Sequence, residues 1–329
     1  MCLSKHAFYS LVLVSSLVCS VLPSQSAETL RVAYPALAPG LSPSWVTAEK
    51  GIWQKHGIDV ELILLSGGSR AIPALVSGSV QVLIGSDTGI TMGILRGMEL
   101  VRLGVTTNSL GSSLLTQSNI TSFSQLKGKV LGISRGRDAS YARLAKVLRD
   151  HGIDPAQDVK FLPIGGGESG RLSALKAKLI QGTMLFPPLD FVAKKEGMNV
   201  LTTFDVPTPA GGINTTVRFS TQNRGLLMRF LKGYIQGIHY MGRNKDESLK
   251  IFSRYLRNAD TEAMGYLYDE IIGRVQKNLR PDPESIRFHL DMAALEDPEA
   301  KQLSETSNWD LSLLEEIQQS GFIAELYKN

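Results

Sequence analysis

The chain has 329 residues, of which 43% are hydrophobic and 20% are charged, and its formal net charge is +4. This length suits two domains better than one, and the composition is ordinary for a soluble globular protein. The sequence contains no run of like charges and no basic stripe interleaved with aromatic residues. We therefore expect no nucleic-acid partner.

The amino terminus is typical of a secretory signal. Lys5 and His6 precede an apolar stretch at residues 7–22, and small residues follow at 24–27. The stretch is shorter than the roughly 20 apolar residues that a membrane span needs. We expect residues 1–27 to be a signal peptide, cleaved after residue 26 or 27, and the mature protein to be periplasmic or secreted.

Both cysteines, Cys2 and Cys19, lie within this segment. The mature chain is therefore expected to lack a disulfide, a thiol nucleophile and a cysteine-based metal site. The five histidines are scattered without the spacing of a metal site. No Ser/His/Asp set or pair of carboxylates can be assembled from the spacing. We predict a protein that is not an enzyme and that holds no cofactor and no metal.

The first third of the mature chain alternates short apolar runs with helix-like stretches. We expect strands at residues 30–34, 60–65, 80–84 and 100–105. Between them we expect helices that begin with Ser44 as N-cap, near Ala71 and near Ile90. Strands that alternate with helices of this length predict a parallel, doubly wound sheet.

The middle third repeats this alternation after the small, polar segment 106–112, which we expect to be a hinge. Strands are expected at residues 130–133, 159–164, 180–186 and 200–204, and a helix at 139–150. Residues 207–212 are interpreted as a loop. Residues 213–219 are then interpreted as a strand that returns through a second hinge.

Two βαβ units share one pattern. Each has the sequence His-Gly-Ile-Asp (56–59 and 151–154), an apolar run, a glycine-rich turn, a helix and a second apolar run. Two such units indicate two similar lobes, each with backbone N–H groups at a helix start. From Gln222 onward the pattern is helical to the end. We assign residues 28–112 and 219–329 to lobe 1, with a helical C-terminal tail, and residues 113–218 to lobe 2.

Seven short segments carry a family resemblance. They are LRVAY (30–34), AEKGIW (48–53), GIDVEL (57–62), GGS (67–69), SGSVQV (77–82), LKGKVLGIS (126–134) and FLKGYIQGI (230–238). In order and spacing they resemble the periplasmic substrate-binding proteins of ABC importers. The resembling group is the nitrate/sulfonate/taurine and thiamine-precursor-like group, with the type II periplasmic binding fold.

The resemblance implies two α/β lobes joined by two crossing strands. It also implies that the lobes close on a small-molecule ligand and that a membrane permease receives it. We expect the protein to be a monomer. The group also includes a fungal pyrimidine-precursor synthase with a cysteine-rich motif and an active-site lysine, but the mature chain has no cysteine. A receptor's sensor component is the other alternative; it would need a span and a signalling domain, and the sequence shows neither.

Candidate ligand contacts lie at glycine-rich turns and at the carboxyl ends of strands, where open α/β sheets bind ligands. In lobe 1 they are Trp45, Gly68, Ser69, Arg70, Ser86, Asp87 and Thr88. In lobe 2 they are Ser134, Arg135, Gly166, Gly167 and Pro187. Each has a structural alternative: the hydroxyls can cap helices, the arginines can face solvent, and Trp45 can belong to the core.

The two glycine loops differ in charge, and we expect this difference to decide ligand choice. The first loop carries Ser69 and Arg70, whereas the second carries Glu168. The second loop, residues 165–170, also matches the dinucleotide pattern G-x-G-x-x-G. Its Glu168 would place a carboxylate beside a pyrophosphate, so we reject that interpretation. Arg70, Arg135 and the two helix starts favour an anion such as a sulfonate, taurine or nitrate, with a pyrimidine-like ligand as the alternative.

Overall fold

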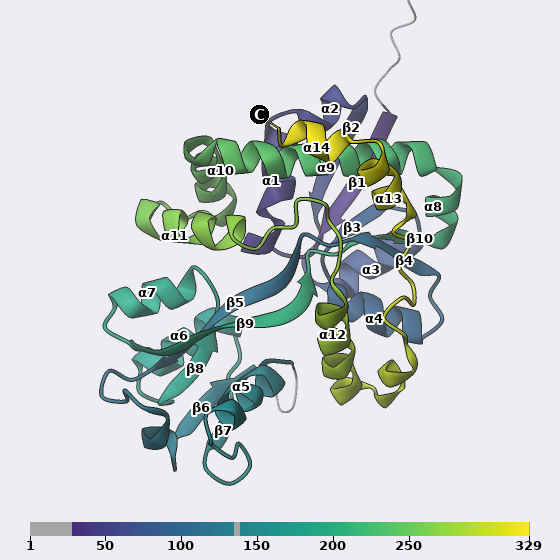
Figure 1. Ribbon diagram of the computed structural model, residues 1–329. Helices are drawn as coiled ribbons and strands as arrows, with labels where there is room; N and C mark the ends of the chain where they lie inside the picture. Colours follow the sequence, from purple (N-terminus) through teal and green to yellow (C-terminus); the bar gives the residue numbers. More distant parts are fainter. Residues whose placement is uncertain (1–27, 135–138, 329) are drawn as a thin grey trace, which may run out of the picture.

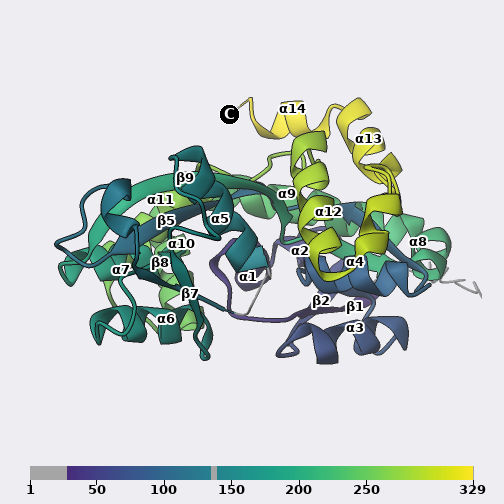
Figure 2. The same ribbon diagram turned by 90° about the horizontal axis from the view of Figure 1, so that it is seen from below.

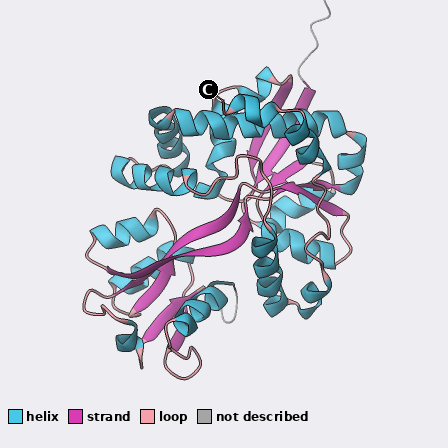
Figure 3. Cartoon of the chain, in the orientation of Figure 1, coloured by secondary structure: helices cyan, strands magenta, loops and turns pink. Residues whose placement is uncertain are grey.

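The computed structural model describes residues 28–134 and 139–328, which form two lobes (Figure 1). The expected signal peptide, with both cysteines, lies outside the described residues, as does Arg135. Within the described ranges no helix is both long enough and apolar enough to cross a membrane. Figure 3 shows that each lobe has a central sheet with helices packed on it.

The first lobe is built on a sheet with the strand order β2-β1-β3-β10-β4. Its strands are β1 (Glu28–Tyr34), β2 (Ile58–Leu64), β3 (Val82–Ile84), β4 (Leu100–Gly104) and β10 (Ile213–Thr216). Strand β10 runs antiparallel to β3 and β4, whereas β1 is parallel to both of its neighbours. The helices of this part are η1 (Pro39–Leu41), α1 (Ser42–Glu49), α2 (Ile52–Lys55), α3 (Gly68–Val76) and α4 (Asp87–Leu95).

The second lobe has the strand order β7-β6-β8-β5-β9. Its strands are β5 (Thr107–Thr116), β6 (Val130–Ile133), β7 (Lys160–Pro163), β8 (Gly182–Leu185) and β9 (Asn199–Ala210). The helices are η2 (Phe123–Leu126), α5 (Ala139–Asp150), α6 (Gly167–Lys176) and α7 (Leu189–Lys195). The predicted fold class, two doubly wound α/β lobes joined by two crossing strands, is confirmed. The expectation of a parallel sheet is wrong, because each sheet is mixed: β10 is antiparallel to β3 and β4, and β5 is antiparallel to β8 and β9.

The two lobes are joined by the long antiparallel pair β5 and β9 (Figure 1). Their register runs from Thr107 opposite Ala210 to Thr116 opposite Asn199. The expected return through residues 213–219 is wrong, because β10 lies inside the first sheet and Val217 begins helix α8. The return is β9, which continues through Pro207 and Pro209. It is an edge strand, where a missing N–H can be tolerated. Residues 213–216, expected in lobe 2, therefore pair with the first sheet.

The C-terminal third is helical, as expected, and it contacts both lobes. It comprises α8 (Val217–Gln222), α9 (Arg224–Arg243), α10 (Lys245–Leu256), α11 (Thr261–Ile272), α12 (Pro283–Glu296), η3 (Pro298–Gln302), α13 (Ser312–Gln319) and α14 (Phe322–Leu326). Helix α9 packs on α1 and α2 of the first lobe, whereas α11 contacts α7 and α12 contacts β9 and α5. Figure 2 shows α12 beside the crossing strands. The tail thus also borders the space between the lobes.

Helix α9 is fixed to the first lobe by close packing of aromatic side chains. The ring of Trp53 stacks on Phe230 with 5.1 Å between centroids, and its Nε1 donates to the Phe230 carbonyl at 3.0 Å. A Cβ on Gly237 would lie 1.8 Å from Oγ1 of Thr47, so α1 and α9 approach closely only because residue 237 has no side chain. This packing holds α1 and α2, which follow the loop after β1, against α9.

Candidate functional site

A cleft of about 700 Å³ lies between the lobes. The segments that follow β1, β3 and β8 at their carboxyl ends line it, together with the crossing strands and residues of α11. Its volume is within the range of roughly 300–1,000 Å³ typical of small-molecule sites. Much of the lining is apolar and includes Leu37, Leu110, Phe186, Met264 and Leu267.

The first-lobe wall is held by Asp87 at the start of α4. Its Oδ1 accepts a hydrogen bond from the backbone N–H of Gly212 at 3.0 Å. A Cβ on Gly212 would lie 2.2 Å from that oxygen, so only glycine fits there. The preceding residue, Ser86, has a left-handed backbone with φ +61°, which is uncommon for a non-glycine residue. Asp87 therefore ties the end of the β9 crossing to the loop after β3.

A buried polar cluster stands behind Asp87. Arg102 is 4% exposed, and its Nη2 donates to the Asp87 carbonyl at 3.0 Å and to Thr91 Oγ1 at 2.6 Å. Thr91 Oγ1 lies 2.8 Å from Nε2 of His289 on α12. The single Thr91 hydroxyl hydrogen points either to the Asp87 carbonyl, 3.2 Å away, or to His289 Nε2.

Burial shifts the pKa of each ionisable member of this cluster toward its neutral form. It raises the pKa of Asp87, while the Arg102 charge and backbone N–H groups act in the opposite direction. It lowers the pKa of Arg102 to about 10, against the effect of Asp87. Burial, together with the charges of Arg102 and Arg143, lowers the pKa of His289 to about 3. His289 is therefore neutral at physiological pH.

The second-lobe wall carries a carboxylate and a guanidinium beside an aromatic ring. Oε2 of Glu168, in the first turn of α6, accepts from the backbone N–H of Phe186 at 3.1 Å. The Arg143 guanidinium carbon lies 5.9 Å from the centroid of the Phe186 ring. Burial raises the pKa of Glu168, and the Phe186 N–H and the neighbouring Arg171 partly offset that rise.

The tail contributes Arg274, which lies across the crossing strands at one edge of the cleft. Its Nε and Nη2 donate to Asp205 Oδ1 of β9 at 3.0 and 2.8 Å, and its Nη1 donates to Glu270 Oε2 of α11 at 2.6 Å. A Cβ on Gly111 would lie 2.6 Å from Nη2. The glycine in β5 thus makes room for a bridge between the tail and the hinge strands.

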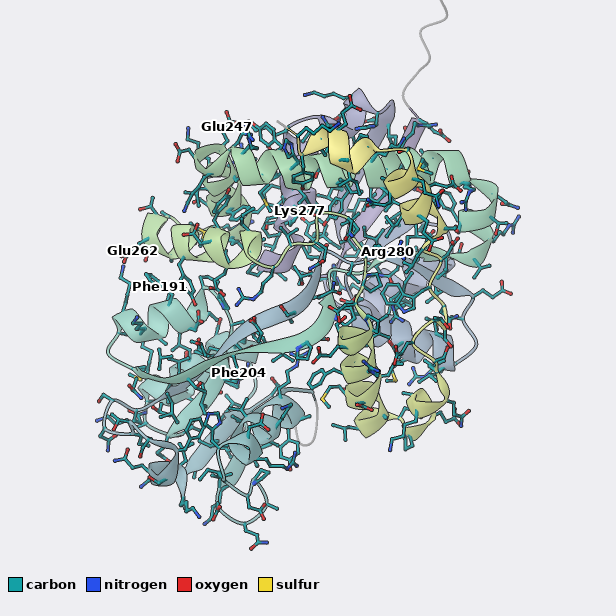
Figure 4. All side chains as sticks on the ribbon, viewed as in Figure 1. Phe191, Phe204, Glu247, Glu262, Lys277 and Arg280 are labelled. Carbon is teal, nitrogen blue, oxygen red and sulfur yellow. The ribbon has the colours of Figure 1, made fainter. Side chains whose placement is uncertain are left out.

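Helices α7 and α11 make a direct contact between the second lobe and the tail. Buried Asp190 accepts from the hydroxyls of Ser113 at 2.8 Å and Tyr266 at 3.0 Å, and the Phe191 and Tyr266 rings stack at 5.1 Å. Lys195 pairs with Glu262 at 2.8 Å. Figure 4 shows Phe191 and Glu262 on these two neighbouring helices.

Three of the predicted contacts, Ser86, Asp87 and Pro187, line this cleft. Gly68 adjoins the wall, because a Cβ there would lie 3.6 Å from Ser86 Oγ. The remaining described candidates of the glycine loops and of α4 are exposed and do not line the cleft: Ser69, Arg70, Thr88, Gly166 and Gly167. The first glycine loop instead supports the wall, since Gly67 N–H donates to the Pro35 carbonyl at 2.8 Å.

Two other candidates serve the protein's own packing. Trp45 is fully buried and stacks on Tyr255 with 4.8 Å between ring centroids, so it belongs to the core and does not line the cleft. Ser134 Oγ accepts a hydrogen bond from buried Arg171. Arg135, the arginine expected beside it, lies outside the described residues.

Sequence reasoning missed two arginines of the cleft, Arg143 and Arg274. Arg143 lies on an amphipathic helix, where an arginine ordinarily faces solvent. Arg274 follows α11, and no local pattern indicates that this helix packs beside the crossing strands. For Glu168 the sequence did carry a signal, namely the difference in charge between the two glycine loops.

Comparison with known proteins identifies the family of this chain. Residues 38–248 match the family model described as NMT1/THI5 like. The chain belongs to the NMT1/THI5-like family. A Brucella abortus (strain 2308) protein named as a binding protein is 26% identical over 267 residues, covering 76% of this chain and 81% of that protein.

Solved structures show the same fold at low sequence identity. The periplasmic aliphatic sulphonate binding protein SsuA from Escherichia coli is 15% identical, with a TM-score of 0.67 over 87% of this chain and 91% of that chain. A sulfonate-binding SsuA from Methylobacillus flagellatus is 17% identical, with a TM-score of 0.70 over 92% of this chain and 96% of that chain. The desulfurization enzyme DszB is 13% identical, with a TM-score of 0.66 over 89% of this chain and 99% of that chain. The fold is therefore that of periplasmic solute-binding proteins, and it also occurs in an enzyme.

Proposed function

We propose that this protein is the periplasmic solute-binding component of an ABC importer. It captures a small organic molecule between its lobes and delivers it to a membrane permease. The observation that carries the proposal is the cleft at the carboxyl ends of strands from both sheets, spanned by the β5–β9 pair. Two lobes joined by two strands can close around a ligand by a hinge motion.

The lining favours an organic ligand over a small inorganic ion such as nitrate. A cleft of about 700 Å³ with a largely apolar lining offers far more contact than such an ion can use. Arg143 supplies a guanidinium for an acidic group such as a sulfonate or carboxylate. Phe186 supplies a flat surface for a pyrimidine-like ring. These features support the sulfonate-like and pyrimidine-like ligands expected from the family resemblance, but not nitrate.

Periplasmic location and a permease partner follow from the same proposal. Residues 1–27 have the pattern of a secretory signal, and the SsuA structures with this fold are periplasmic binding proteins. The protein then acts as a monomer that meets its permease at the membrane.

A ligand screen combined with solution scattering tests the proposal. Melting temperatures are measured with sulfonates, carboxylates, nitrate and pyrimidines, and scattering is recorded with and without the strongest stabiliser. We expect an organic compound to raise the melting temperature and to reduce the radius of gyration. A protein that binds no member of the panel and releases no small molecule on denaturation would contradict the proposal.

A further inference from the structure

The crossing pair β5–β9 is interrupted close to the first lobe. Thr107 lies opposite Ala210, and the next registered pair is Ser109 with Pro207, so one residue of β5 faces two residues of β9. A bulge of this kind disrupts the ladder of hydrogen bonds locally. The β9 side of the bulge also holds two prolines, which have no N–H to donate. Bending between the lobes therefore meets the least resistance at this bulge.

On the first-lobe side of the bulge, the chain is tied to the C-terminal tail. The N–H of Val105 donates to the Leu279 carbonyl at 2.8 Å, and the N–H of Gln276 donates to the Thr106 carbonyl at 2.7 Å. The Thr106 hydroxyl also donates to the Gly211 carbonyl at 2.9 Å, which joins the two crossing segments to each other. Both segments are thus held to the first lobe and the tail up to the bulge.

The bulged residue is Asn108, and its side chain is bonded to the start of α12. Its Nδ2 donates to the Arg280 carbonyl at 2.8 Å, and its Oδ1 accepts from the Asp282 N–H at 3.0 Å. The Ser285 hydroxyl lies 3.2 Å from the same oxygen. Asp282 is the N-cap of α12, and its Oδ1 accepts from the Ser285 N–H at 2.7 Å. Asn108 can therefore move only if these bonds break or if the start of α12 moves with it.

Helix α12 is itself anchored to the first lobe. Two turns along the helix, buried His289 places its Nε2 2.8 Å from the Thr91 hydroxyl of α4. The same helix packs against β9 and against α5 of the second lobe, and Figure 2 shows it beside the crossing strands. One rigid helix thus joins the bulge to the first lobe and lies against the second.

We propose that α12 restrains the bending between the lobes and that Asn108 is the residue through which it does so. The bonds of Asn108 narrow the range of angles that the lobes sample, and wide bending requires their release. The proposal goes beyond ligand capture, because it concerns the motion of the lobes whichever molecule binds. It is also independent of the family match, which covers residues 38–248 and does not include α12.

The variant Asn108→Ala removes the restraint. Spin labels are placed on two exposed residues, Arg96 of the first lobe and Lys129 of the second, with both native cysteines changed to Ser. The distance distribution is recorded without added ligand, so the result does not depend on ligand capture. Loss of two neutral hydrogen bonds should raise the population of bent states about fivefold to a hundredfold and broaden the distribution. Amide exchange at residues 109–111, just past the bulge, should accelerate by a similar factor.

Two further variants isolate the contact. Ser285→Ala removes only the hydroxyl beside Asn108 and keeps the backbone bond to the Asp282 cap. This small change preserves the fold, and it should broaden the distribution less than Asn108→Ala does. Asn223→Ala is the matched control, because Asn223 is also half-buried and donates to the Phe219 carbonyl at 3.2 Å, between α8 and α9 of the first lobe. It should leave the distribution as in the parent protein.

Each outcome decides for or against the restraint. A broader distribution and faster exchange past the bulge in Asn108→Ala, with a smaller effect in Ser285→Ala, support it. An unchanged distribution in Asn108→Ala overturns it, and so does equal broadening in Asn223→Ala. If exchange shows that residues 283–296 have lost their helix in Asn108→Ala while the distribution stays narrow, α12 does not restrain the lobes and the inference is also overturned.

Discussion

Removing one hydroxyl, with Tyr266→Phe, should loosen the contact between α7 and α11. The Tyr266 hydroxyl donates to Asp190 Oδ2 at 3.0 Å across the two helices. Asp190 is 2% exposed and keeps its bonds to Ser113 Oγ and the Phe191 N–H in the variant. The substitution therefore removes one bond between the lobe and the tail and leaves the second lobe intact.

The expected size of the Tyr266→Phe effect follows from the burial of the Asp190 carboxylate and from its charge. A hydrogen bond to a charged group contributes about 1.5–3 kcal/mol. Its loss should shift the equilibrium between contacting and separated helices about tenfold to a hundredfold. The neighbouring Lys195–Glu262 pair is 46% and 66% exposed, and such pairs contribute about 0.2–1 kcal/mol. Lys195→Gln should therefore shift the same equilibrium by less than about sixfold.

Distances between spin labels on the two lobes report this equilibrium. Cys2 and Cys19 are the native cysteines. With both changed to Ser, labels can be placed on the exposed residues Lys129 and Lys250, which belong to the second lobe and to α10. Tyr266→Phe should broaden the distance distribution toward larger values, and Lys195→Gln should change it little. Identical distributions for Tyr266→Phe and the parent would refute the assigned role of this contact.

Two further predictions concern packing and pH. Gly237→Ala should lower the free energy of unfolding by about 1–3 kcal/mol, because the new Cβ would lie 1.8 Å from Thr47 Oγ1. Gly225→Ala in the same helix meets open space and should be neutral or slightly stabilising. Equal losses for the two variants in denaturant titrations would contradict the packing. The pKa of His289 is lowered to about 3 in the folded protein, below the unfolded value of about 6.5. The contribution of neutral His289 to the free energy of unfolding is therefore complete above pH 6.5 and is lost as the pH falls toward 3. Between pH 6.5 and 5 the free energy of unfolding should fall by up to about 1.4 kcal/mol per pH unit from this residue. When unfolding is measured at pH 6.5 and at pH 5, the free energy of unfolding should fall less in His289→Gln than in the parent protein. An equal fall in both proteins would show that His289 is not its source.

Much of the alternating architecture was predictable because strands such as β2 and β6 are short apolar runs close to glycine residues. The polar strand β5, Thr107–Thr116, was instead interpreted as a hinge over residues 106–112. Residues 60–65 and 130–133 are strands in the structure at nearly those bounds. The crossing strand β9 was predicted too short, since prolines usually end strands and the sequence alone does not show that β9 lies at an edge. The Ser44 cap was wrong as well: α1 begins at Ser42 with a proline in its first turn, and Ser44 Oγ donates to the Leu41 carbonyl at 2.6 Å.

The candidate site was only partly predictable, because half of its chemistry depends on tertiary packing. Ser86 and Asp87 follow a predicted strand, and their position at the cleft follows from the general behaviour of α/β sheets. Trp45 could not be assigned to the core without knowing that Tyr255, some 200 residues later, stacks on it. Arg274 reaches the cleft through α11, whose position is set by contacts with α7 and α10.

The central claim is that a small organic molecule binds between the two lobes. The most direct test is a crystal structure of the protein saturated with the compound that raises its melting temperature most. We predict electron density for that compound in the cleft, in contact with Ser86 or Asp87 on one side and with Glu168 or Phe186 on the other. Density for the compound elsewhere on the surface, with the cleft between the lobes empty, would contradict the account.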